Sequence, residues 1–139
     1  MNVVRILCGP TASGKSAVGL HLARELRAEI FSIDSMKIYR SLDIGTAKPQ
    51  REALSEIKHH LIDIREPWES FSVADFLHEA ERLIADCAAR NVPLIGEGGT
   101  ALYLKALSEG LFEGPGRDME LRARLEAEAE VVGISKMHE

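Results

Sequence analysis

The sequence is poor in cysteine, proline and long apolar runs, and each shortage excludes a class of protein. The two cysteines, Cys8 and Cys87, are too few for a disulfide framework and have no metal-ligand spacing, so we expect two thiols buried among apolar neighbours. No apolar run approaches the roughly 18–20 residues of a membrane span, and the first residues lack the basic start and cleavage site of a signal peptide. We therefore expect a cytoplasmic protein without a membrane partner.

Basic residues are also fewer than acidic ones, so the net charge of the 139 residues is −5. A negative balance argues mildly against a nucleic-acid binder, since phosphate contacts need local positive charge. The basic residues are nevertheless concentrated between residues 37 and 60, and the acidic ones between residues 109 and 130. The length and the 45% of hydrophobic residues indicate one globular domain with a single core.

Apolar runs of strand length alternate with segments of helical periodicity. We expect strands at residues 3–7, 29–34 and 93–97, with a shorter one at 60–64. We expect helices at residues 16–27, 52–57, 73–90 behind the N-cap Ser72, 101–109 and from 118 onward, with a glycine-rich turn at 110–117. This alternation predicts an α/β fold with a parallel sheet and helices on both faces.

A phosphate-binding loop follows the first predicted strand. The pattern G-x-x-x-x-G-K-[ST] is matched by Gly9, Pro10, Thr11, Ala12, Ser13, Gly14, Lys15 and Ser16. The glycines allow the backbone amides to point at phosphate oxygens, and the following helix adds the positive end of its dipole. Lys15 supplies a point charge, and the Ser16 hydroxyl is placed to bind Mg²⁺. The loop makes the fold P-loop NTPase-like, but kinases, NTPases and other diphosphate users all share it.

Further segments lie where the loops of such a fold meet. Asp34 ends the second predicted strand, where it could accept a proton, bind Mg²⁺ or cap a turn. A second glycine turn, Gly98, Gly99 and Thr100, opens a helix. In chain order, the segments are GPTASGKS (9–16), DSMKIY (34–39), DIGTAKP (43–49), HHLID (59–63), SFSVADF (70–76) and GGTALYLKAL (98–107).

This series of segments closely resembles the bacterial tRNA dimethylallyltransferase family, from residue 3 to about residue 130. The resemblance implies transfer of a dimethylallyl group from dimethylallyl diphosphate to the exocyclic amine of the adenosine 3′ of the tRNA anticodon, with Mg²⁺ as cofactor. It implies Asp34 as general base, Thr11 near the reacting groups, the loop residues 9–16 as diphosphate ligands and Ser16 as metal ligand. The tRNA contacts that it implies are Asp34, Ser35, Met36, Lys37, Thr46, Lys48, Gly99 and Thr100.

The chain departs from the family pattern in three ways. Lys37 stands where many members have glutamine, and Glu97 stands where we expect an apolar residue, so that it either reaches the site or disturbs the strand. Family members are also much longer and are expected to be monomeric. We therefore expect residues 1–139 to be the N-terminal transferase core, truncated in mid-fold with an exposed apolar edge, and residues 110–139 to begin a helical insert. Such a chain would be poorly active or inactive by itself.

Two alternative hypotheses for the function stay open. One is a small-molecule P-loop transferase, either a nucleotide kinase or an adenylate dimethylallyltransferase, although residues 110–117 are too poor in arginine for a kinase lid. The other is a non-catalytic fragment that binds diphosphate without turnover.

Overall fold

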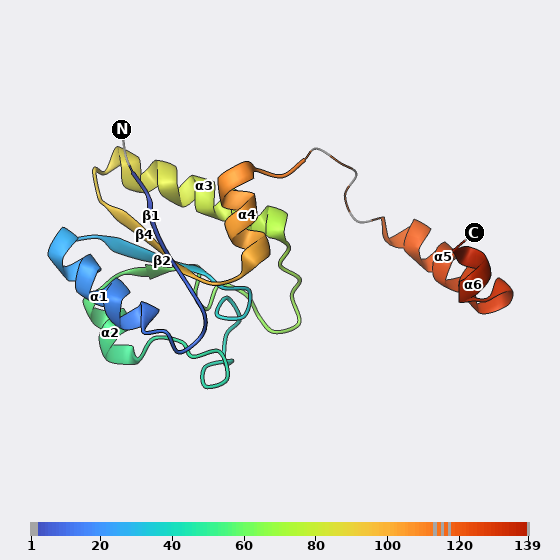
Figure 1. The fold of residues 1–139 in the computed structure, drawn as a ribbon, viewed down its shortest axis with the longest axis horizontal. Helices are drawn as coiled ribbons and strands as arrows, with labels where there is room; N and C mark the ends of the chain where they lie inside the picture. The colour runs from blue at the N-terminus through green and yellow to red at the C-terminus, as the bar shows by residue number, and fades with distance from the viewer. Residues whose placement is uncertain (1–2, 113, 115, 117, 139) are drawn as a thin grey trace.

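The computed structural model describes residues 3–112, 114, 116 and 118–138 of the chain. In this part of the chain, four parallel strands form one sheet in the order β1–β4–β2–β3 (Figure 1). Their bounds are β1 Arg5–Cys8, β2 Glu29–Ile33, β3 His59–His60 and β4 Leu94–Gly98. The parallel pairing confirms the predicted fold class.

The strand predicted at residues 60–64 is wrong in its bounds. β3 contains only His59 and His60, which pair with Ile30 and Phe31 of β2. Leu61 and Asp63 then have φ angles of 59° and 55°. A strand requires negative φ, so the chain leaves the sheet directly after β3.

The predicted helices are all present, close to their expected ranges. Ser72 is the N-cap of α3, where its hydroxyl accepts from the Asp75 amide while the Asp75 carboxylate accepts from the Ser72 amide. A further short helix, α6, follows the last predicted one. The bounds are α1 Lys15–Leu26, α2 Arg51–Glu56, α3 Val73–Ala89, α4 Ala101–Glu109, α5 Met119–Val132 and α6 Ile134–Met137.

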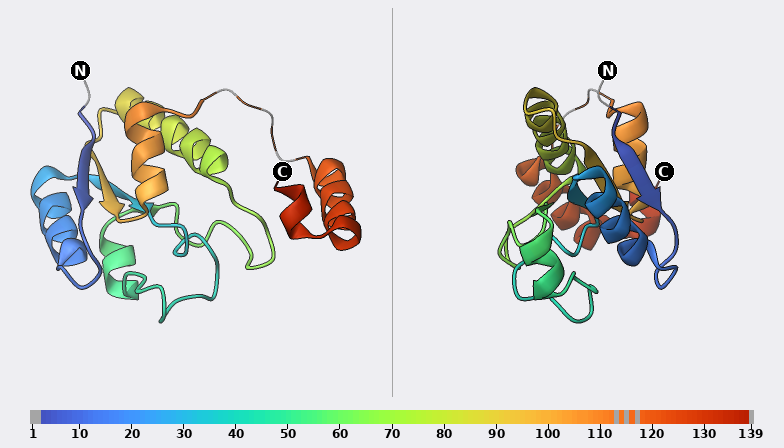
Figure 2. Two further views of the ribbon diagram at one scale, coloured as in Figure 1. Left: turned by 45° about the vertical axis from the view of Figure 1, so that its right-hand side comes forward. Right: turned by 90° about the vertical axis from the view of Figure 1, so that its left-hand side faces the viewer.

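Helices cover both faces of the sheet, as expected (Figures 1 and 2). On one face, Phe31 and Ile33 of β2 pack with Phe76 of α3 and Tyr103 of α4. The rings of Phe76 and Tyr103 are stacked with centroids 4.0 Å apart, which joins these two helices. Alternate residues of the same strands face α1, so that Ile30 packs with Ala23.

β1 is an edge strand of the described sheet, since it pairs only with β4 there. Three of its four residues, Arg5, Ile6 and Cys8, are correspondingly exposed. The prediction that both cysteine thiols are buried is therefore wrong for Cys8 and confirmed for Cys87, a residue of α3 that lies in the core. The apolar run of β1 predicted a strand correctly, but an apolar sequence does not show whether its strand lies at an edge of the sheet.

α5 and α6 pack on each other and lie away from the sheet in Figures 1 and 2. Asp118 caps α5 by accepting a hydrogen bond from the Leu121 amide at 2.9 Å. The glycine-rich turn predicted at residues 110–117 includes residues 113, 115 and 117, which lie outside the described residues. Within the described part of the chain, no helix has the length and apolar character needed to cross a membrane.

Candidate active site

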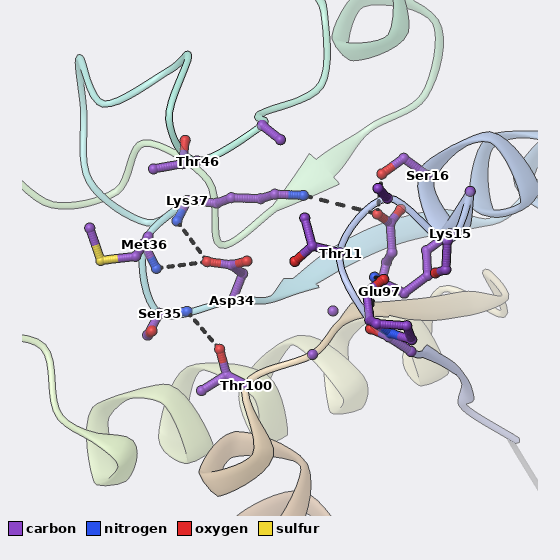
Figure 3. A pocket seen from close by; sticks show the side chains of 18 of the residues that line it. Thr11, Lys15, Ser16, Asp34, Ser35, Met36, Lys37, Thr46, Glu97 and Thr100 are labelled. Atoms are coloured by element: carbon purple, nitrogen blue, oxygen red, sulfur yellow. Dashed lines mark hydrogen bonds and ion pairs between the residues drawn. The ribbon is translucent and has the colours of Figure 1, made fainter.

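A pocket of about 580 Å³ opens at the carboxyl ends of β1, β2 and β4 (Figure 3). Parallel α/β sheets place their ligand sites at this edge because the loops after the strands converge there. Every predicted diphosphate ligand of the loop, residues 9–16, lines the pocket. So do most of the residues predicted to contact tRNA: Asp34, Ser35, Met36, Lys37, Thr46, Gly99 and Thr100.

The phosphate-binding loop joins β1 to α1, with Gly14 as the N-cap. Gly14 has a φ of 83°, a left-handed conformation that glycine adopts without steric cost. The Lys15 ammonium donates to the Gly9 carbonyl at 2.8 Å and to the Pro10 carbonyl at 2.6 Å, so it lies over the loop. The loop therefore brings a helix N-terminus and an ammonium group to one side of the pocket, as an anion site requires.

Asp34 stands directly after β2 and is held by the backbone that follows it. Its Oδ1 accepts from the Met36 amide at 2.8 Å and from the Lys37 amide at 3.2 Å. Asp34 is thus a turn cap, one of the roles left open by the sequence, and this role fixes the orientation of its carboxylate. No hydrogen bond to the other oxygen, Oδ2, is seen among the described residues, and the carboxylate faces Thr11 in Figure 3.

The second glycine turn lies against both the phosphate-binding loop and the end of β2. Gly98 is so close to β2 that a Cβ there would lie 2.1 Å from the Ile33 carbonyl oxygen, and one on Gly99 would lie 3.2 Å from the Gly9 carbonyl oxygen. The Thr100 hydroxyl accepts from the Ser35 amide at 3.1 Å. These contacts explain why two glycines and a threonine occur together here, since they couple the three loops that line the pocket.

Glu97 is a charged residue of the pocket to which the sequence pattern assigned no role. It does not disturb β4, because residues 94–98 form a regular strand, and its side chain reaches the pocket. Only 6% of Glu97 is exposed. One of its oxygens, Oε1, accepts from the Ser16 hydroxyl at 2.5 Å and lies 4.0 Å from the Lys37 ammonium (Figure 3). The only sequence signal was an acidic residue in an otherwise apolar strand.

Lys48 does not line the pocket, although the sequence predicted it to contact tRNA. Its side chain is 4% exposed, and its ammonium donates to Asp43 at 2.9 Å, to Asp63 at 2.5 Å and to the Tyr39 carbonyl at 2.5 Å. Burial alone would lower the pKa of Lys48, but the hydrogen bonds to Asp63 and Asp43 outweigh it and raise the pKa. Lys48 therefore fixes the DIGTAKP loop, and Thr46 and Ala47 are the residues of this loop that line the pocket.

The chemistry of the pocket follows from its charges and donor atoms. Lys15 and Lys37 bring positive charge, and Asp34 and Glu97 bring carboxylates. Lys15 and the loop amides suit a diphosphate, and Asp34 can accept a proton. The hydroxyl of Ser16 beside a carboxylate offers the hard oxygen donors that suit Mg²⁺.

Comparison with known proteins shows which family the chain belongs to. The chain is 51% identical to the tRNA dimethylallyltransferase of Janthinobacterium sp. (strain Marseille) over 98% of this chain and 43% of that protein. It is 52% identical to the tRNA dimethylallyltransferase of Chromobacterium violaceum over 96% of this chain and 41% of that protein. The chain thus spans less than half the length of these curated relatives.

Solved structures agree with the sequence comparison. The full-length tRNA isopentenylpyrophosphate transferase of Bacillus halodurans is similar with a TM-score of 0.76 and 43% identity, over 99% of this chain and 45% of that one. A eukaryotic dimethylallyltransferase acting on tRNA is similar with a TM-score of 0.77 and 27% identity, over 91% of this chain and 32% of that one. A family model described as IPP transferase matches residues 37–139. The chain therefore belongs to the IPP transferase family.

Proposed function

We propose that the protein is a tRNA dimethylallyltransferase, which transfers a dimethylallyl group from dimethylallyl diphosphate to the exocyclic amine of the adenosine 3′ of a tRNA anticodon. The observation that carries the proposal is the meeting of an anion-binding loop and a fixed carboxylate, Asp34, in one pocket. The names of the similar proteins support the choice of donor group and acceptor. The pocket volume of about 580 Å³ is within the range of small-molecule sites, which suits the donor and one base.

The diphosphate of the donor binds to the amides of the loop and to Lys15. Cleavage of the allylic carbon–oxygen bond places negative charge on the leaving diphosphate, and donors that already point at this position stabilise it. When bound, Mg²⁺ supplies further positive charge to the diphosphate, and Ser16 is the loop residue that would hold it. Lys15, Ser16 and the loop amides would thus stabilise the leaving group.

Asp34 acts on the acceptor amine and not on the diphosphate of the donor. As the amine nitrogen forms its bond to the allylic carbon, the amine proton passes to the Asp34 carboxylate, and diphosphate departs toward the loop. Thr11 lies between Asp34 and Glu97 in Figure 3, where its hydroxyl would be near the reacting groups. The adenine must leave its stack to reach this pocket. Ser35, Met36, Lys37, Thr46, Gly99 and Thr100 form the remaining wall that would receive it.

The test is a transfer assay with the full-length protein. Radiolabelled dimethylallyl diphosphate and Mg²⁺ are incubated with tRNA, with AMP or with ADP. We expect label in tRNA alone. Label in AMP or ADP would instead indicate an adenylate dimethylallyltransferase. Diphosphate binding without transfer to any acceptor would indicate a non-catalytic binding protein.

A further inference from the structure

Glu97 is a buried carboxylate within a strand of the sheet, a position at which a charged side chain is unusual. It lies on β4, between Leu7 of β1 and Ser32 of β2 in the pairing register. An acidic side chain that is withdrawn from water is costly unless it is paired or binds a cation. An apolar side chain would fill this position of a parallel strand more cheaply. The partners of Glu97 therefore indicate what the carboxylate does.

The space around Glu97 is shaped for its side chain. Gly19 lies in the interior of α1 and faces Glu97, and a Cβ on Gly19 would lie 2.9 Å from Glu97 Oε2 and 3.5 Å from Leu7 Cδ1. Glycine in a helix interior is destabilising relative to alanine. The room for the Glu97 carboxylate is thus made at a cost to α1, which favours a specific role for this carboxylate.

The closest contact of Glu97 is the residue expected to bind the cation. Its Oε1 lies 2.5 Å from the Ser16 hydroxyl, whereas the Lys37 ammonium is 4.0 Å away. Asp34 is differently placed, because its Oδ1 accepts from the amides of its own turn and it lies on the other side of Thr11 in Figure 3. Among the described carboxylates of the pocket, Glu97 is the one hydrogen-bonded to Ser16.

We propose that Glu97 is a carboxylate ligand, direct or through a water, of the divalent cation that binds at Ser16. This inference rests on the proposed function only in that it places the leaving diphosphate on the same loop. In P-loop NTPases, a loop serine or threonine and an acidic residue at a strand end hold Mg²⁺ together. Ser16 and Glu97 reproduce this pairing of donors, with Glu97 on the strand next to β1.

Lys37 fits the same arrangement as a counter-charge. Its side chain is largely buried, and its ammonium competes with a metal ion for Oε1 of Glu97. The two departures from the family pattern, Lys37 and Glu97, thus lie together in space. The competing explanation is that Glu97 serves only to neutralise Lys37, and substitutions at these two residues separate the two roles.

The experiment measures Mn²⁺ and inorganic diphosphate binding to the full-length protein. Mn²⁺ replaces Mg²⁺ because free and bound Mn²⁺ are distinguished by electron paramagnetic resonance, and calorimetry gives the diphosphate affinity with and without metal. The variants are Glu97→Gln, Lys37→Gln and the double variant. Glu97→Gln keeps a side chain that can accept from Ser16 but removes the charge, and circular dichroism checks that each variant is folded.

We expect Glu97→Gln to weaken Mn²⁺ binding by about 10–100-fold, in line with the loss of a metal-site carboxylate, and to leave metal-free diphosphate binding little changed. We expect Lys37→Gln to strengthen Mn²⁺ binding, a result that does not depend on how well Glu97→Gln folds. The double variant should bind Mn²⁺ as weakly as Glu97→Gln. Wild-type affinity in the double variant would show that Glu97 only neutralises Lys37, and unchanged Mn²⁺ affinity in Glu97→Gln would also overturn the proposal.

The same measurements distinguish this failure from that of the proposed function. Diphosphate and Mn²⁺ are tested without tRNA, so a protein that binds both through Glu97 but transfers no label refutes only the proposed transfer. A wild-type protein that binds neither refutes the anion site itself and this inference with it.

Discussion

Lys15 carries the positive charge that lies over the phosphate-binding loop, where its ammonium contacts the Gly9 and Pro10 carbonyls. An ammonium–phosphate hydrogen bond is typically worth about 1.5–3 kcal/mol, which corresponds to more than tenfold in affinity. We predict that Lys15→Ala weakens diphosphate binding by more than tenfold in calorimetry with Mg²⁺. Lys105→Ala on the exposed side of α4 is the matched control, because it removes the same charge away from the pocket. Equal affinities of Lys15→Ala and the wild type would exclude the loop as the anion site.

Asp34 allows proton transfer to be separated from metal binding. In Asp34→Asn, the amide oxygen can still accept from the Met36 and Lys37 amides, so the turn is kept while the proton acceptor is lost. We predict a fall of roughly 10²–10⁴-fold in the single-turnover transfer rate, the usual contribution of a positioned base. Affinity for dimethylallyl diphosphate should change little, with or without Mg²⁺. A large loss of Mg²⁺-dependent affinity would make Asp34 a metal ligand instead.

At the scale of elements, Glu29 connects three of them at the start of β2. Arg90, the C-cap of α3, donates to both carboxylate oxygens of Glu29 at 2.9 and 3.0 Å. The Nε2 of His60, on β3, lies 2.6 Å from Oε2 of Glu29. The Arg90 hydrogen bonds, opposed by burial and assisted by His60, lower the pKa of Glu29 from 4.5 to about 2. Because the folded pKa is the lower one, Glu29 stabilises the fold above about pH 4.5 and loses this contribution as the pH falls toward 2.

We therefore predict a difference in acid sensitivity between the wild type and Glu29→Gln. Between about pH 7 and about pH 3, the free energy of unfolding of the wild type should fall by about 1–2 kcal/mol more than that of Glu29→Gln, after allowance for solvent screening. Urea unfolding at the two pH values measures this difference. Glu109→Gln, at an exposed site on α4, should behave as the wild type. Parallel pH dependence of wild type and Glu29→Gln would show that the Arg90 pairing does not stabilise the fold.

The elements themselves were largely predictable, because each depends on local signals. Buried parallel strands leave apolar runs in the sequence, and Ser72 with Asp75 marks the start of α3. The end of β3 was not predictable, since nothing local shows that Leu61 and Asp63 adopt positive φ.

Site residues were predictable where a motif fixes the backbone. They were unpredictable where the strand order determines which distant residues come into contact. The loop residues and Asp34 follow from their positions at strand ends. Glu97 meets Ser16 across 81 residues of sequence, and only because β4 lies next to β1. The sequence likewise shows that Lys48 is charged but not that it is buried against Asp43 and Asp63.

At the scale of the whole molecule, the described chain leaves a strand edge and several apolar side chains uncovered. β1 is one edge strand of the described sheet, Val3 before it and Ile6 within it are 61% and 43% exposed, and α5 exposes Leu121 and Leu125. Exposed edges of this kind pair with other chains, and large exposed apolar patches promote association. The sheet edge and α5 are therefore the regions through which the chain of 139 residues should associate with itself.

We predict that the chain of 139 residues alone shows an apparent mass above that of one chain in light scattering, increasing with protein concentration. Ile6→Lys should lower this mass, because a lysine on an edge strand opposes pairing with a second edge. Ile44→Lys is the matched control, since it adds the same charge at an exposed loop residue outside β1. If association proceeds through the β1 edge, Ile44→Lys should leave the mass unchanged. Equal reductions by both variants would point to net charge, and a monodisperse monomer would show that the β1 edge does not drive association.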